Sequence, residues 1–171
     1  MAHNQFELLK QRRFLPFFLT QSLGAFNDNV FRNAMLALMV YQMGLSTEQS
    51  TLYANLAPAL FILPYFLFSA TAGQIAEKYE KARLIRVTTA MEIAILSLAS
   101  FGFIYGIPWL LLFCLFLTGV QSTLFGPVKY AILPQVLAPE ELTGGNGLVE
   151  MGTSISILIG MIAGMSLLMI P

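Results

Sequence analysis

The sequence has 171 residues, of which 57% are hydrophobic and only 11% are charged, whereas a soluble domain carries roughly 25% charged residues. So few charges cannot cover the wet surface of a globule of this size, and the mean hydropathy of +0.73 agrees. The low charge and the aromatic content of 12% also exclude a disordered chain. Nine Lys and Arg residues balance nine Asp and Glu residues, so net charge predicts no nucleic-acid partner. Composition therefore predicts an integral membrane protein.

Apolar segments predict an all-α protein with about five membrane-spanning helices, because one span takes about 20 apolar residues. The polar residues 1–13 are expected to form a cytoplasmic amino-terminal segment, and residues 14–171 a transmembrane bundle. The expected helices cover about residues 14–42, 51–72, 84–105, 109–135 and 146–170.

The basic residues predict the orientation, because cytoplasmic loops carry an excess of Lys and Arg. They gather before the first helix and around the second loop: Lys10, Arg12, Arg13, Lys78, Lys81, Arg83 and Arg86. The first and third loops hold none, so the amino terminus is expected in the cytoplasm.

Five spans would place Pro171 on the outer side without a polar tail. We therefore expect the chain to be an amino-terminal piece of a longer protein.

Five ionisable residues fall at or inside membrane depth: Asp28, Arg32, Glu92, Lys129 and Glu150. An intramembrane charge costs several kcal/mol and usually faces a cavity or a partner. Asp28 and Arg32 are four residues apart, a spacing that favours an ion pair on one helix face. They form either a structural pair that neutralises itself or the wall of an aqueous path for substrate or ions, and we favour the path.

The other three intramembrane charges allow different readings. Glu92 has no obvious partner in the sequence, so a buried neutral side chain and a pore-lining one are both open. Lys129 either anchors the helix at the inner interface or attracts an anionic head group. Glu150 is expected to face a cavity, because it lies opposite a ridge of small residues suited to close helix packing. That ridge consists of Gly152, Ser156, Gly160 and Gly164.

Signals for catalysis are absent from the sequence. It contains no phosphate-binding G-x-x-x-x-G-K-[ST] loop, no nucleophile paired with a base and no cluster with metal-ligand spacing. We therefore expect no catalytic residue, no cofactor and no metal site in this chain.

The second loop resembles the signature loop of the major facilitator superfamily, G-x-L-A-D-R-x-G-R-[KR]. The matching positions are Gly73, Ile75, Ala76, Glu77, Lys78, Lys81 and Arg83. Glu77 replaces the usual aspartate and Lys78 the arginine, so the pattern of charge is kept. The resemblance implies a gating role for Gly73, Glu77, Lys78, Lys81 and Arg83.

Three further stretches resemble the lysophospholipid transporter family, a bacterial branch of that superfamily. They are Gly-Ala-Phe-Asn-Asp-Asn at 24–29, Gly-Pro-Val-Lys-Tyr-Ala-Ile-Leu-Pro at 126–134 and Asn-Gly-Leu-Val-Glu at 146–150. The resemblance adds Asn27 and Asn29 to the candidate path residues. Arg32, four residues after the aspartate, is similar to the branch that is often fused to an acylglycerophosphoethanolamine acyltransferase and an acyl-carrier-protein synthetase.

The resemblance implies part of the first half of a twelve-helix carrier in the bacterial inner membrane. Such carriers move lysophospholipid inward for reacylation by alternating access. The implied partners are lysophospholipid or another amphipathic substrate, membrane lipid, the remaining helices of the same transporter and a fused or associated acyltransferase. Two alternatives stay open: a proton-coupled carrier of a small soluble solute, and a membrane anchor for a phospholipid acyltransferase.

Overall fold

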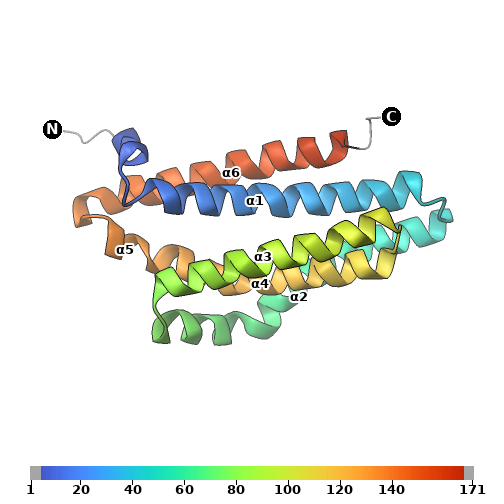
Figure 1. Ribbon diagram of the computed structural model, residues 1–171, viewed down its shortest axis with the longest axis horizontal. Helices are drawn as coiled ribbons and strands as arrows, with labels where there is room; N and C mark the ends of the chain where they lie inside the picture. Colours follow the sequence, from blue (N-terminus) through green and yellow to red (C-terminus); the bar gives the residue numbers. More distant parts are fainter. Residues whose placement is uncertain (1–4, 168–171) are drawn as a thin grey trace.

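The computed structural model describes residues 5–167, and within them every regular element is helical (Figure 1). The elements are η1 (Gln5–Lys10), α1 (Leu15–Ala37), η2 (Leu38–Gln42), α2 (Thr47–Lys78), α3 (Lys81–Ile104), α4 (Pro108–Ala131), α5 (Leu133–Val136), η3 (Pro139–Glu141) and α6 (Leu142–Ser166). The start of the expected amino-terminal segment, the end of the last expected span and Pro171 lie outside the described residues.

Several helix ends differ from the predicted ones for local reasons. The second helix begins at Thr47 because Ser46 and Gln49 form a reciprocal capping box. It continues to Lys78, so most of the expected second loop is helical and only Tyr79 and Glu80 separate α2 from α3. The fourth helix passes through Pro127 and ends at Ala131, after which the one-turn helix α5 begins.

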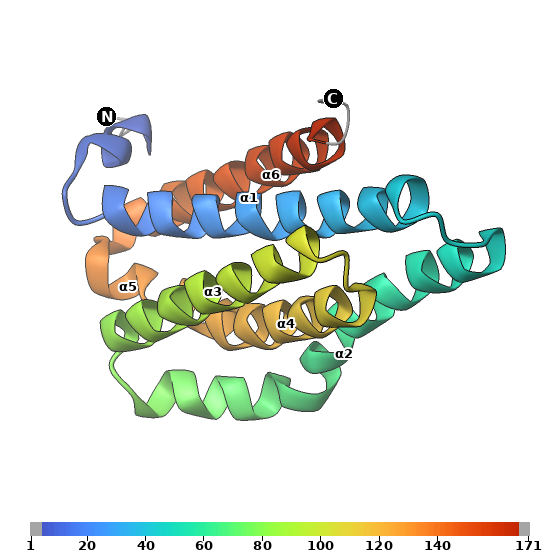
Figure 2. The ribbon, with the colours of Figure 1, turned by 45° about the vertical axis from the view of Figure 1, so that its right-hand side comes forward.

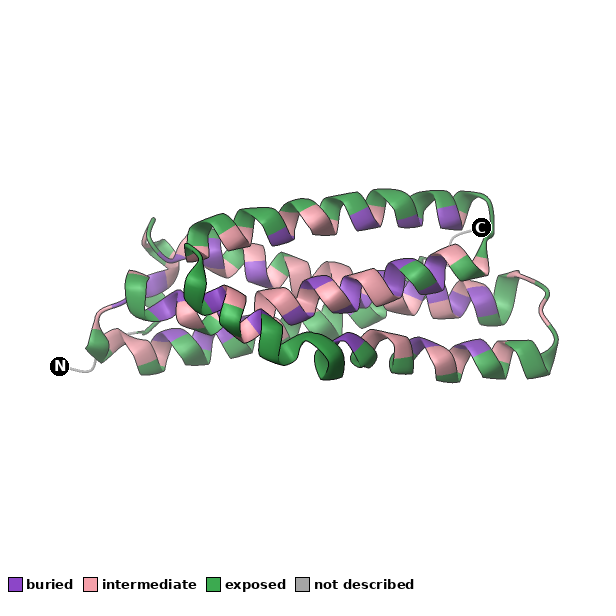
Figure 3. Ribbon diagram, turned by 90° about the horizontal axis from the view of Figure 1, so that it is seen from below, coloured by how far each residue is buried: buried purple, intermediate pink, exposed green. Residues whose placement is uncertain are grey.

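Within residues 5–167, four helices are long and apolar enough to cross a membrane: α2, α3, α4 and α6. Helix α1 has a comparable 23 residues, but its polar residues lower its hydropathy. The outer faces of the described bundle are largely exposed (Figure 3). They carry large apolar side chains, such as Phe66 at 82% and Ile104 at 76% exposure. Because such a surface is stable in lipid rather than in water, the chain is an integral membrane protein.

The helices form two layers, one of α1 and α6 and one of α2, α3 and α4 (Figures 1 and 2). Glycines allow close approach within each layer. A Cβ at Gly160 of α6 would lie 2.6 Å from the carbonyl oxygen of Phe26 on α1, and a Cβ at Gly119 of α4 would meet the carbonyl oxygen of Phe61 on α2. Figure 2 shows α2 bending in its middle, where Pro58 and Pro64 interrupt its hydrogen bonding.

Two apolar clusters close the seam between the layers. The η2 cluster joins α1 and η2 to α2, α3 and α4 through Phe31, Met35, Met39, Tyr53, Ala57, Ile95, Ala99, Leu111, Leu112, Cys114 and Leu115. The α5 cluster lies at the other end of α1 and consists of Leu8, Phe14, Phe17, Ile132, Leu133, Leu137, Leu148 and Val149. The polar residues Gln21, Asn27, Asp28 and Asn29 of α1 lie between the α1 residues of these two clusters.

Candidate functional site

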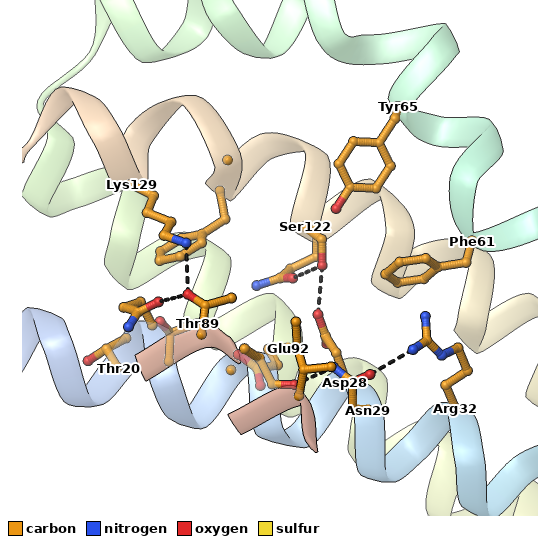
Figure 4. A pocket seen from close by; sticks show the side chains of 18 of the residues that line it. Thr20, Asp28, Asn29, Arg32, Phe61, Tyr65, Thr89, Glu92, Ser122 and Lys129 are labelled. Atoms are coloured by element: carbon orange, nitrogen blue, oxygen red, sulfur yellow. Dashed lines mark hydrogen bonds between the residues drawn. The ribbon is translucent and has the colours of Figure 1, made fainter. Parts of the chain in front are cut away.

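A cavity of about 350 Å³ opens between the two layers and is lined by side chains of all five long helices (Figure 4). This volume falls within the range of small-molecule sites, about 300–1,000 Å³. Four of the five predicted intramembrane charges line it: Asp28, Arg32, Glu92 and Lys129. Figure 4 shows Lys129 and Arg32 at opposite ends of the site, with Asp28, Ser122 and Glu92 between them.

Asp28 is bound across the seam rather than along its own helix. The Ser122 hydroxyl of α4 donates a hydrogen bond of 2.8 Å to Asp28 Oδ2. Arg32 donates instead to Asn29 Oδ1 at 2.6 Å, and its guanidinium lies 5.6 Å from the centre of the Phe61 ring. Among the described residues, the ion pairs within 4 Å do not include Asp28 with Arg32, so the self-neutralising pair is not formed.

Glu92 has a partner that the sequence did not reveal. Asn27 Nδ2 of α1 donates to Glu92 Oε1 at 3.1 Å, so Glu92 joins α3 to α1. Asn27 itself is not part of the cavity lining, whereas Asn29 is.

Lys129 and Glu150 form an ion pair between α4 and α6, with Nζ and Oε1 3.0 Å apart. The Tyr130 hydroxyl donates to the same carboxylate oxygen at 2.8 Å. Lys129 also donates to Thr153 Oγ1, which donates in turn to Gln21 Oε1 on α1. The side chain of Glu150 is 53% exposed and does not line the cavity. The expectation that Glu150 faces the cavity is therefore corrected: Lys129 and Tyr130 hold it at the bundle surface.

The predicted gating residues lie apart from the cavity. Gly73, Glu77 and Lys81 line a shallow second pocket beside Pro127 and Ala131 of α4. The ammonium group of Lys78 lies 5.8 Å from the Tyr79 ring centre, and Arg83 is exposed. These residues thus gather where α2 meets α3, near the end of α4.

The predicted ridge of small residues on α6 faces α1. A Cβ at Gly152 would lie 2.7 Å from the Phe18 ring and from Ser22 Oγ, and one at Gly164 would lie 2.6 Å from the Val30 carbonyl oxygen. Ser156, between them on the ridge, is half-buried. Glu150 lies away from this contact.

Neutral side chains of the site that were not singled out from the sequence include Phe61, Tyr65 and Thr153. Ser122 had a usable signal, since it shares a helix face with Gly126 and Lys129 at steps of four and three residues. Phe61 and Thr153 had none, because their roles depend on which helices become neighbours. Within residues 5–167, no group of three or more His, Cys, Asp or Glu side chains is suitable for a metal ion.

Comparison with known proteins assigns the family. The sequence model of the Major Facilitator Superfamily matches residues 17–170. The chain belongs to the major facilitator superfamily. Its fold is accordingly part of a facilitator-superfamily bundle.

Curated relatives narrow the similarity. The chain is 31% identical over 156 residues to the lysophospholipid transporter LplT of Serratia proteamaculans (strain 568). The aligned region covers 91% of the chain and 36% of that protein. The lysophospholipid transporter LplT of Cronobacter sakazakii gives the same identity and coverage. That of Salmonella typhimurium is 31% identical over 150 residues, with coverage of 88% and 35%. The chain therefore spans about a third of the length of these relatives. No solved structure matches it significantly.

Proposed function

We propose that this chain is the amino-terminal part of a secondary carrier that moves lysophospholipid inward across a bacterial inner membrane by alternating access. The observation that carries the proposal is the polar cavity between the two layers of an otherwise apolar bundle. Two cations and two carboxylates line it. An intramembrane charge is costly, so a wet or ligand-filled cavity accounts for four of them in one place.

The chemistry of the site suits an amphipathic substrate. Arg32 and Lys129 can attract a phosphate, and guanidinium and ammonium groups both form strong hydrogen bonds to phosphate oxygens. Asp28 and Glu92 supply negative charge between them. The acyl chain can stay against the apolar helix faces, so the cavity needs to hold only the polar head. The similarity to named lysophospholipid transporters supports this substrate class.

The ion pair of Lys129 and Glu150 offers a route from binding to movement. A substrate phosphate at Lys129 competes with Glu150, and its capture weakens one of the polar links between α4 and α6. Charges in a site of low dielectric interact strongly. When Lys129 exchanges Glu150 for the substrate phosphate, the relative stability of the inward-open and outward-open arrangements of the two layers therefore changes. Glu77, Lys78, Lys81 and Arg83 then latch the cytoplasmic gate.

The test is transport of labelled lysophospholipid into vesicles that carry the complete protein. Asp28→Asn removes the charge but leaves an oxygen that accepts the Ser122 hydrogen bond, so folding is expected to persist. We expect at least about a hundredfold loss of transport, as for removal of one strong electrostatic contact of about 3 kcal/mol. Glu48→Gln, an exposed carboxylate outside the seam, is the matched control and should transport normally.

The results also separate the alternatives. Unchanged transport in Asp28→Asn removes this residue from the mechanism. A wild-type protein that moves a small soluble solute but no lysophospholipid favours the proton-coupled carrier. A protein that moves nothing, while a soluble acyltransferase expressed without the helices keeps its activity, favours the membrane anchor.

A further inference from the structure

Glu92, like Asp28, is a carboxylate of the cavity that uses only one of its two oxygens in a hydrogen bond. Its Oε1 accepts from Asn27, and Oε2 lies near Gly24, where a Cβ would be 3.4 Å away. In the described part of the chain, the ion pairs within 4 Å join Arg13 to Glu141 and Lys129 to Glu150, so Glu92 has no cation beside it.

The free oxygen of Glu92 is accessible from the cavity. Among residues 5–167, no buried side-chain nitrogen or oxygen lacks a hydrogen-bond partner. Oε2 has no such partner and is therefore not fully buried, and Glu92 lines the cavity. An ionised carboxylate at membrane depth with a vacant acceptor is costly unless a cation or donor reaches it.

The other charges of the cavity each have a partner, as Glu92 has Asn27. Lys129 is paired with Glu150, Arg32 is held by Asn29 and the Phe61 ring, and Asp28 accepts from Ser122. With the charge of Lys129 balanced by Glu150, the cavity contains two carboxylates and one guanidinium. It therefore favours a ligand group with a positive charge.

We propose that Glu92 selects the head group of the cargo by binding its primary ammonium group. This inference rests on the proposed function and extends it to specificity. An ammonium group has three donors. Thr89, one helical turn before Glu92, also lines the cavity and adds a hydroxyl acceptor on the same face of α3. The phosphate of the same head group then lies toward Arg32 or Lys129, the two cations at the ends of the site.

The experiment compares two lysolipids that differ in this group. Uptake and equilibrium binding of lysophosphatidylethanolamine and lysophosphatidylglycerol are measured on the complete protein, in vesicles and in detergent. Glu92→Gln keeps an oxygen for Asn27 and removes the charge. We expect the affinity for the ethanolamine lipid to fall at least about tenfold, while that for the glycerol lipid is unchanged or rises. Glu140→Gln, an exposed carboxylate of η3, should change neither.

Two results with the Glu92→Gln variant overturn the inference. An equal fall for both lipids assigns Glu92 to packing or to a coupling ion, and no change for either removes it from recognition. A wild-type protein that moves neither lipid refutes the proposed function. In that case the binding measurements on the same variants still decide whether Glu92 distinguishes an ammonium group.

Discussion

The contact between α1 and α6 depends on glycine. The change in the free energy of unfolding caused by Gly160→Ala measures how strongly the contact depends on it. A Cβ at this position would lie 2.6 Å from the Phe26 carbonyl oxygen and 3.0 Å from Asn29 Cβ. Ordinary contact begins at 3.4 Å, so the two helices must separate locally by about 0.8 Å. A gap of about 0.5–1 Å forfeits a quarter to a half of the dispersion energy of the atoms beside it.

The expected cost follows from overpacking, which typically destabilises by about 1–3 kcal/mol. Alanine also favours the helix over glycine by about 1 kcal/mol, which offsets part of this cost. The matched control is Gly147→Ala on the same helix, where a Cβ would meet nothing within 4 Å. This control gains the same helix propensity without the clash, so the difference between the two variants isolates the packing term.

The assay is reversible unfolding of the protein in mixed micelles, followed by circular dichroism. We expect Gly160→Ala to be less stable than Gly147→Ala by about 1–3 kcal/mol. Because Asn29 holds Arg32, a shift of α1 should also weaken substrate binding. Equal stability of the two variants would refute the reasoning, since it would mean that α6 is not in close contact with α1.

Two further predictions concern the ion pairs that join distant segments. A double-mutant cycle of Lys129→Met and Glu150→Gln should give a coupling energy of about 1 kcal/mol that shrinks with salt, because Glu150 is 53% exposed. A coupling of zero would show that the pair does not join α4 to α6. Arg13→Gln removes the 2.7 Å pair with Glu141. It should speed amide exchange in residues 133–141 while changing global stability by about 1 kcal/mol or less, and unchanged exchange would contradict this role.

Helix content and approximate bounds could be predicted because apolar run length and charge depletion are local properties. The ends were harder to predict, since α2 extends through Gly73 to Lys78 although the sequence there is polar. Helix continuation depends on the i to i+4 backbone bonds, and these tolerate polar side chains once the helix leaves the apolar layer. Similarly, the break after Ala131 follows from the local geometry around Pro134 rather than from Pro127.

The charged residues of the cavity could be listed from the sequence, but their pairing could not. Asp28 and Arg32 have the spacing of an ion pair, yet Asp28 is bound by Ser122, 94 positions away. Glu92 had no visible partner and is bound by Asn27. Glu150 was expected in the cavity and lies outside it. Periodicity tells which residues share a face, whereas the facing helix decides what each side chain meets.

By itself, the sequence determined that this chain is a bundle of apolar helices with a few costly charges, because the energy of transfer to lipid depends only on composition and length. Only the tertiary structure decided that four of those charges meet in one cavity and that the fifth lies outside. The reason is physical: close approach at Gly119, Gly152 and Gly160 sets which helices are neighbours, and a hydrogen bond forms only where that packing brings donor and acceptor together.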